Sequence, residues 1–296
     1  VLALQVPWKP HFVFERARAV TLFRFGWKLL ASGLLDQGYQ SLSDLMIGKV
    51  FSSSDLGYVS QGKRYPNALG GLLDGAIQPV MLSAVAHAQS DHALVKRIAR
   101  RALKTSTFLV VPAMALFAAA AEPIVRVVLG EAWVPCVPFL QMYCFVYALL
   151  PIHTTNLQTL NGMGRSDLFL RLEVIKKIVG IAILAFTVFV LRDLHLIVAG
   201  YMVSGVLSTF INASPNKRVI GYAYHEQIRD ILPAFVMAAV AAVMTLMVPL
   251  AGLPDLLTIL LQVVVMAVAY LGIALLFRVE EFTYLRNTLK ELLGRS

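Results

Sequence analysis

The sequence predicts an all-α fold, a polytopic membrane helix bundle of about eight transmembrane helices. Of its 296 residues, 58% are hydrophobic and only 15% are charged, and the mean hydropathy is +0.72. Soluble globular domains contain about 25% charged residues. The chain also contains long apolar runs such as residues 259–277, in which Gln262 is the one strongly polar member. Runs of this length are typical of helices that cross a lipid bilayer.

Eight apolar spans follow one another along the chain. They cover about residues 29–50, 57–84, 105–121, 136–160, 172–191, 195–213, 231–251 and 256–277. Around them we expect a basic amphipathic lead-in at 1–28, a cytoplasmic linker at 214–230 and a cytoplasmic tail at 278–296. The connections are short, which leaves no room for an extramembrane catalytic domain and argues against an enzyme.

The basic residues predict how the spans cross the membrane. The formal net charge is +9, and connections on alternate sides carry 21 and 5 of the 26 Lys and Arg residues. Because cytoplasmic loops of membrane proteins are enriched in Lys and Arg, we expect both ends of the chain to be cytoplasmic. The net charge is therefore a topology signal, and we do not expect nucleic-acid binding.

Polar residues recur at helical spacing in the first two spans and form one stripe on each helix. The stripes consist of Asp36, Gln40 and Asp44 in the first span and of Lys63, Asn67, Asp74 and Gln78 in the second. Asp44 lies at a similar depth to Lys63 and Arg64, so it could pair with either. An ionised group near the bilayer centre costs roughly 2.5 to 3.5 kcal/mol, so we expect both stripes to face the bundle interior or a wet cavity.

The second span also contains Pro66, Pro79 and several glycines. Prolines can kink a helix and glycines allow close helix packing, so flexing and tight packing both remain open for this span.

After the second span, the basic segment 87–104 predicts an amphipathic helix on anionic headgroups. Binding of a substrate's phosphates is the alternative role for its cations. Residues 122–133 then predict an amphipathic return along the outer interface, with Trp133 as an aromatic anchor.

The fourth span is richer in polar residues than the later ones and contains Gln141, His153 and Asn156. His153 could couple transport to protons, because imidazole titrates near neutral pH, or it could be a hydrogen-bonded packing residue. Cys136 and Cys144 are eight residues apart on one expected helix, about 12 Å along its axis, which is too far for a disulfide. These cysteines predict no metal site, and the sequence predicts no cofactor. The fifth to eighth spans are expected to carry less chemistry.

Several short motifs occur in a characteristic order. They are Asp-Leu-Met-Ile-Gly at 44–48, Asp-Leu-Gly-Tyr at 55–58, Arg64 with Pro66, Leu-Gly-Glu-Ala-Trp at 129–133 and Asn-Gly-Met-Gly-Arg at 161–165. From about residue 23 to 220 this succession resembles the bacterial polysaccharide flippases, which handle O-antigen or other lipid-linked oligosaccharides, of the multidrug/oligosaccharidyl-lipid/polysaccharide exporter superfamily. Lys63, beside the family-like Arg64, departs from the family pattern.

The resemblance implies an architecture and a function. Members of the family have fourteen helices in two six-helix lobes plus a terminal pair. Residues 29–213 look like the second lobe and 231–277 like the terminal pair, so we expect the chain, which starts at Val1 and not at Met, to be the C-terminal part of a longer protein.

The implied function is alternating-access transport of undecaprenyl-diphosphate-linked oligosaccharide across the bacterial inner membrane, for surface polysaccharide or lipopolysaccharide biosynthesis. The implied partners are this substrate, anionic membrane lipids, and polymerase and glycosyltransferase proteins of the same pathway.

Ten residues are candidates for the substrate cavity. Lys63 and Arg64 could attract the diphosphate. Three acids could hold these cations between cycles or take up a coupling ion, and they are Asp36, Asp44 and Asp74. Five amides could bind sugar hydroxyls, and they are Gln40, Asn67, Gln78, Gln141 and Asn156.

Three alternatives to this assignment stay open. A buried ion-pair network of Asp44 with Lys63 or Arg64 could serve packing alone. An ion-coupled multidrug-type exporter of the same superfamily would favour a carboxylate-lined cavity. A membrane-embedded glycan polymerase or ligase would favour basic catalytic residues on a long outer loop.

Overall fold

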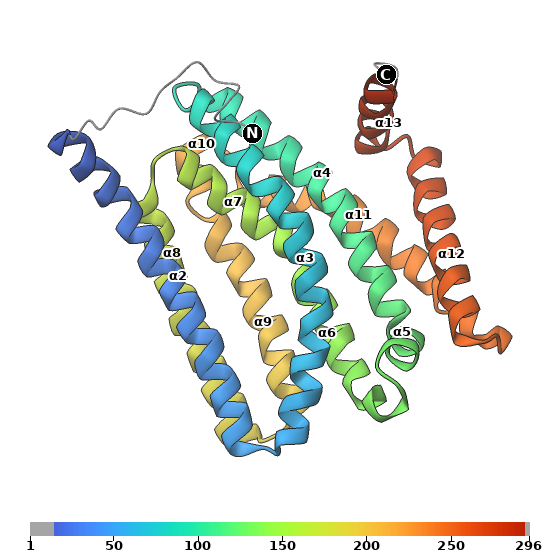
Figure 1. Cartoon of the computed structure of the whole chain (residues 1–296). Helices are drawn as coiled ribbons and strands as arrows, with labels where there is room; N and C mark the ends of the chain where they lie inside the picture. Colours follow the sequence, from blue (N-terminus) through green and yellow to red (C-terminus); the bar gives the residue numbers. More distant parts are fainter. Residues whose placement is uncertain (1–14, 294–296) are drawn as a thin grey trace, which may run out of the picture.

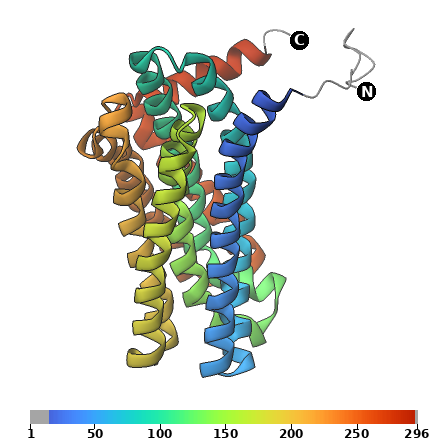
Figure 2. The ribbon, with the colours of Figure 1, turned by 90° about the vertical axis from the view of Figure 1, so that its left-hand side faces the viewer.

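The computed structural model describes residues 15–293, and these form a bundle of helices with no strand among them (Figure 1). The long helices run up and down across the bundle. In both views α10, α13 and the start of α4 lie at the same end (Figure 1, Figure 2). The predicted all-α fold is confirmed.

The first half of the bundle contains three long helices and a broken fourth segment. Its elements are α2 (Arg16–Val50), α3 (Ser53–Ala88), α4 (His92–Ala119), α5 (Ala121–Val128), the 3₁₀ helix η1 (Glu131–Cys136), α6 (Val137–Ala148) and α7 (Leu150–Gly162). The expected interfacial return at 122–133 is thus made of α5 and η1.

The second half contains four further long helices and several short ones. Its elements are α8 (Ser166–Phe186), the π-helical turn η2 (Thr187–Leu191), α9 (Leu194–Ala213), α10 (Asn216–Ile220), α11 (Tyr224–Thr245), the 3₁₀ helix η3 (Val248–Ala251), α12 (Asp255–Leu276) and α13 (Glu280–Leu293).

The helix starts are encoded by short polar side chains. Ser52 accepts a hydrogen bond from the backbone N–H of Asp55, whose carboxylate accepts one from Ser52 in return. Asp91 and Asp193 cap α4 and α9 through the N–H groups of Leu94 and Leu196. These caps satisfy N–H groups that the helices leave free, and so they fix where each helix begins.

Seven helical segments are long and apolar enough to cross a membrane. They are Ser53–Ala88, His92–Ala119, Glu131–Gly162, Ser166–Leu191, Leu194–Ile220, Tyr224–Thr245 and Asp255–Leu276. Many of their large apolar side chains point outward, for example Leu256 at 61% exposed and Leu276 at 77%. Outward apolar side chains suit a lipid surround, and the protein is a multi-pass membrane protein.

The helix α2 is the expected first span and the one that differs from the other seven. It is 35 residues long, which is ample to cross a bilayer. It is not among the seven apolar segments because its polar stripe makes it less apolar. Only Ser32, Ser43 and Ile47 of α2 are buried, and α2 packs chiefly along α8.

Two helix boundaries differ from the expected spans. The basic segment 87–104 and the third span are parts of one continuous helix, α4. Most of the expected linker at 214–230 is helical, because α10 lies within it and α11 already begins at Tyr224. In α4, the charged residues Lys96, Arg100 and Lys104 have acidic partners on neighbouring helices, which is compatible with one continuous helix.

The helix α3 continues through both Pro66 and Pro79. Gly62 on α3 lies against the backbone of α6, where an added methyl group would come within 2.8 Å of Phe139 Cβ and 2.9 Å of the Leu140 nitrogen. Gly71 on the same helix has nothing within 4 Å. The close-packing interpretation therefore holds at Gly62.

We expect Gly62→Ala to lower the free energy of unfolding by about 1 to 3 kcal/mol, because the new methyl group overpacks against a backbone that cannot move aside. Gly71→Ala is the matched control and should be neutral or slightly stabilising, since alanine favours the helix. Thermal unfolding of the purified protein in detergent measures both. Equal melting temperatures for the two variants would contradict the packing assignment.

Candidate functional site

A cavity of about 250 Å³ lies among α2, α3, α6, α7, α8 and α9. Its charged side chains are Lys63, Lys176, Lys177 and Asp36, and its tyrosines are Tyr39, Tyr143, Tyr147 and Tyr201. We name it the lysine–tyrosine cavity. Three of the ten predicted residues line it, and they are Asp36, Gln40 and Lys63.

A continuous set of polar contacts crosses this cavity from α8 through α2 to α3. Lys177 on α8 forms an ion pair with Asp36 on α2. The Gln40 amide donates to the other Asp36 oxygen at 2.8 Å. Lys63 on α3 then donates to the Gln40 carbonyl oxygen at 3.1 Å. These contacts satisfy each charged group inside an apolar bundle, where an unpaired charge is costly.

The remaining lysine of the cavity also has a partner. Lys176 lies 2.5 Å from the carboxylate of Glu173, one turn earlier on α8. Glu173 is buried and Lys177 lies 4.0 Å from it. The Lys177 ammonium also lies 4.9 Å from the centre of the Tyr39 ring, within range of a cation–π attraction.

The charge balance of the cavity favours an anionic guest. Three lysines line it, and two carboxylates pair with them, that of Asp36 in the lining and that of Glu173 behind it, so one positive charge remains in excess. Ser43, Ser204 and Ser208 add hydroxyl groups, and the four tyrosines add ring faces with hydroxyl ends. Hydroxyls and ring faces are suited to a polar, hydroxyl-rich group beside an anion.

His153 also lines the cavity, and its Nδ1 accepts a hydrogen bond from the Asn212 amide at 3.0 Å. This contact agrees with the hydrogen-bonded packing role expected as one of its two alternatives. Its other ring nitrogen, Nε2, is left for a second contact.

Two more predicted residues form a second polar group further along α3. Asp74 accepts hydrogen bonds from Gln78 and from Thr154 on α7. The Gln158 amide donates to Gln78 at 3.4 Å. Asp74 is half-buried, and Gln78 is exposed.

Three of the predicted residues are exposed on α2 and α3, and they are Asp44, Arg64 and Asn67. The pairing of Asp44 with Lys63 or Arg64 does not form among the described residues. The reason is geometric: α2 packs chiefly along α8 and makes few contacts with α3, and Lys63 bonds Gln40 instead.

The last two predicted residues lie away from the lysine–tyrosine cavity. Gln141 donates to the Ala118 carbonyl of α4 at 3.2 Å and lines a different, mainly apolar groove. Asn156 is buried and exchanges hydrogen bonds of 2.9 and 3.0 Å with Gln227 on α11. Both residues lie on faces of the fourth span that turn toward α4 and α11, so they act in helix packing.

Sequence reasoning missed Lys176 and Lys177, because both were counted as cytoplasmic topology signals. The i, i+3 spacing of Glu173 and Lys176 inside an apolar span was the available signal. The convergence of four tyrosines had no such signal, since they come from three separate helices.

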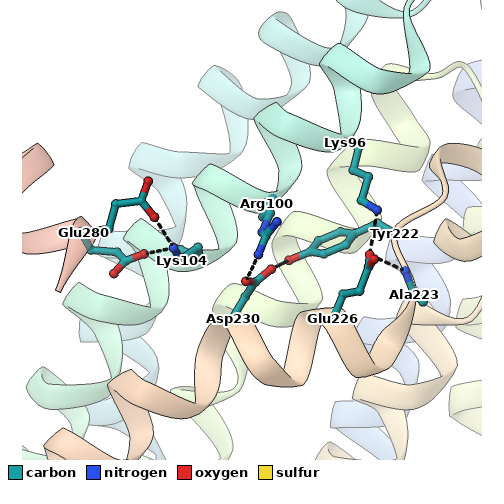
Figure 3. Close-up of polar contacts among 9 residues, drawn as sticks. Lys96, Arg100, Lys104, Tyr222, Ala223, Glu226, Asp230 and Glu280 are labelled. Carbon is teal, nitrogen blue, oxygen red and sulfur yellow. Dashed lines mark hydrogen bonds and ion pairs between the residues drawn. The ribbon is translucent and has the colours of Figure 1, made fainter.

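A second set of charged residues joins α4 to α11 and α13 (Figure 3). Lys96 pairs with Glu226 at 2.8 Å and Arg100 with Asp230 at 2.7 Å. Asp230 is buried, and it also accepts a hydrogen bond of 2.7 Å from the Tyr222 hydroxyl. Each acid in this set pairs with a base on another helix, so the set holds these helices together. We name it the joint.

The joint extends to α13 through Lys104. Its ammonium lies 2.7 Å from Glu280 and 2.5 Å from Glu281. The hydrogen bond from Lys104 lowers the pKa of Glu280 below its ordinary value. Three basic residues of the predicted amphipathic segment thus bind acids of the protein itself.

Comparison with known proteins gives two findings. Residues 1–138 match the family model described as "Polysaccharide biosynthesis protein". The fold is similar to the solved structure titled "Lipid II flippase MurJ, inward closed conformation", with a TM-score of 0.70 and 14% sequence identity, over 93% of this chain and 58% of that chain. No curated protein matches in sequence.

The family match links the first part of the chain to proteins of polysaccharide biosynthesis. At 14% identity, the structural likeness by itself shows a shared fold. The chain spans 58% of the length of that flippase. The resemblance predicted from the motifs at 44–66 and 129–133 is therefore supported, since both segments fall within the matched residues.

The contact of Asp36 with Lys177 should appear as thermodynamic coupling in a double-mutant cycle. We expect Asp36→Asn and Lys177→Gln each to lower the free energy of unfolding. The double variant should lose less than the sum, by on the order of 1 kcal/mol, because each single change strands the other charge. Detergent-solubilised protein and a chemical denaturant provide the measurement.

Asp44→Asn combined with Lys177→Gln is the control cycle, and its effects should add, since Asp44 is exposed and forms no ion pair with Lys177. Strict additivity in the Asp36 cycle would mean that the pair does not hold α2 against α8.

Proposed function

We propose that the protein transports undecaprenyl-diphosphate-linked oligosaccharide across the bacterial inner membrane, for O-antigen, lipopolysaccharide or other surface polysaccharide biosynthesis, by alternating access. The observation that carries this proposal is the lysine–tyrosine cavity, which holds three lysines and four tyrosines within apolar helices. The matched family model and the flippase fold support the same class of function.

The chemistry of such a substrate matches the cavity. Its sugars and diphosphate cannot cross hydrocarbon unaided, so a transporter has to offer them polar partners while the polyprenyl tail stays in lipid. Lys63, Lys176 and Lys177 would attract the diphosphate, and Gln40 and the serines would bind sugar hydroxyls. Lys177 already forms an ion pair with one anion, the carboxylate of Asp36. In this proposal an incoming phosphate takes over Lys177 and releases Asp36.

The exposed polar residues of α2 and α3 extend the proposed pathway. Asp44, Arg64, Asn67 and Gln78 are exposed on helices that would otherwise face lipid. Polar side chains at membrane depth normally face protein or a water-filled cavity. We propose that this face closes against a further lobe of a longer transporter, with the substrate pathway between them.

The proposed orientation has both ends of this chain in the cytoplasm, because the connections that carry 21 of the 26 cations would then lie there. Polymerase and glycosyltransferase proteins of the same pathway are the proposed protein partners.

The cavity argues against an exporter of small amphiphilic cations, because its lysines outnumber its carboxylate. A glycan polymerase or ligase is not favoured either. The described connections between the long helices are short, whereas a polymerase or ligase would be expected to have a long outer loop with basic catalytic residues.

The test is surface glycan display in cells that carry variants of the whole parent protein. We expect Lys63→Gln and Lys177→Gln to reduce display at least tenfold at normal protein level, because each removes a cation from the cavity. Arg64→Gln should reduce display less, since Arg64 is exposed and does not line the cavity.

Lys49→Gln is the control, because Lys49 is an exposed cation at the end of α2 that lies outside the cavity. Normal display with Lys63→Gln and Lys177→Gln would remove the lysine–tyrosine cavity from the transport pathway.

A further inference from the structure

A second cavity, of about 670 Å³, lies at the end of the bundle that carries α10. It is formed by the start of α4, the turn between α7 and α8, the first turns of α8, and the connection from α9 into α10. Its basic residues are His92, Arg165, Arg171 and Arg218. We name it the arginine pocket. It shares no residue with the lysine–tyrosine cavity.

The charge in the arginine pocket is not neutralised by the protein itself. Arg165 bonds the Asp167 carboxylate at 3.1 Å through two nitrogens. Within residues 15–293, Arg171 and Arg218 form no ion pair, and no acidic side chain lines the pocket. This differs from α4, where Lys96, Arg100 and Lys104 each hold an acid of the protein (Figure 3).

Arginine is the side chain best suited to bind a phosphate group, because its planar guanidinium can donate two parallel hydrogen bonds to two phosphate oxygens. Arg171 and Arg218 come from α8 and α10, so one phosphate between them would be held from two elements. A single unpaired arginine on a surface would give no such arrangement.

Apart from Ser214, the rest of the pocket lining is apolar. Leu168, Leu172 and Ile175 lie at helical spacing on α8 and share one face with Arg171. Ile175 is 38% exposed, so this apolar strip leads from the pocket to the outer, lipid-facing surface of the bundle. A ligand with one phosphate and one hydrocarbon chain would satisfy both parts, whereas a free phosphate would leave the strip unused.

We propose that the arginine pocket binds an anionic membrane phospholipid. Its phosphate lies between Arg171 and Arg218, and an acyl chain follows Leu168, Leu172 and Ile175 along α8. The pocket is at the cation-rich end of the bundle, where the positive-inside rule puts the anionic inner leaflet. Such a lipid would hold the ends of α8 and α10 together. The proposal does not depend on transport, since it uses none of the cavity residues above.

The test measures lipid retention on the purified full chain by native mass spectrometry. The added lipids are dioleoyl phosphatidylglycerol, which is anionic, and dioleoyl phosphatidylcholine, which is zwitterionic. We expect phosphatidylglycerol to bind preferentially, and Arg171→Gln with Arg218→Gln to weaken its binding by up to about thirtyfold. Ile175→Ser should weaken it as well, because it interrupts the apolar strip.

The matched control is Lys217→Gln with Arg229→Gln. It removes the same charge from the same end of the bundle, and neither residue lines the pocket. Equal weakening in this control would overturn the proposal, because it would show general surface attraction.

Equal binding of the two lipids would also overturn the proposal. Inorganic pyrophosphate is the third probe, and it separates a soluble phosphate from a lipid. Binding of pyrophosphate as tight as that of phosphatidylglycerol would overturn the role of the apolar strip.

Discussion

The ion pair between Lys177 on α8 and Asp36 on α2 is the contact on which the arrangement of the polar helices depends. The helix α2 buries only three residues and makes few contacts with α3, so its position is fixed mainly against α8. In hydrocarbon a charged group without a partner costs several kcal/mol. The pairing therefore determines which face of α2 turns inward, and Gln40 and Lys63 complete the link to α3.

The same constraint separates two kinds of charged site in this protein. At the joint of α4 with α11 and α13, each base is matched by an acid, and Asp230 is buried with two donors. Such a network fixes helix register and leaves little charge for a ligand. In the lysine–tyrosine cavity and the arginine pocket, cations outnumber acids. An excess of cations over acids is what an anionic ligand needs.

The architecture explains how a polar cavity can exist inside an apolar bundle. The fourth segment is interrupted between α6 and α7 at Leu149 and Pro151, where the cavity residues Tyr147 and His153 lie. Broken helices are tolerated at membrane depth where they line protein or water rather than lipid. One large apolar cluster lies among α4, α6, α11 and α12, and a second packs around the cavity tyrosines Tyr39, Tyr143 and Tyr201.

The sequence by itself determined the class of fold, most of the long apolar spans and the residues that carry charge, because these follow from hydropathy and helical period, which act locally. It also put Asp36, Gln40 and Lys63 on two polar stripes, although it expected Lys63 or Arg64 to meet Asp44, whereas Lys63 bonds Gln40. Only the tertiary structure decided that Asp44 stays exposed, that Asn156 packs in a buried amide cluster and that Lys177 completes the cavity. Helical periodicity gives the face on which a side chain lies, whereas the neighbour of that face depends on how distant helices pack.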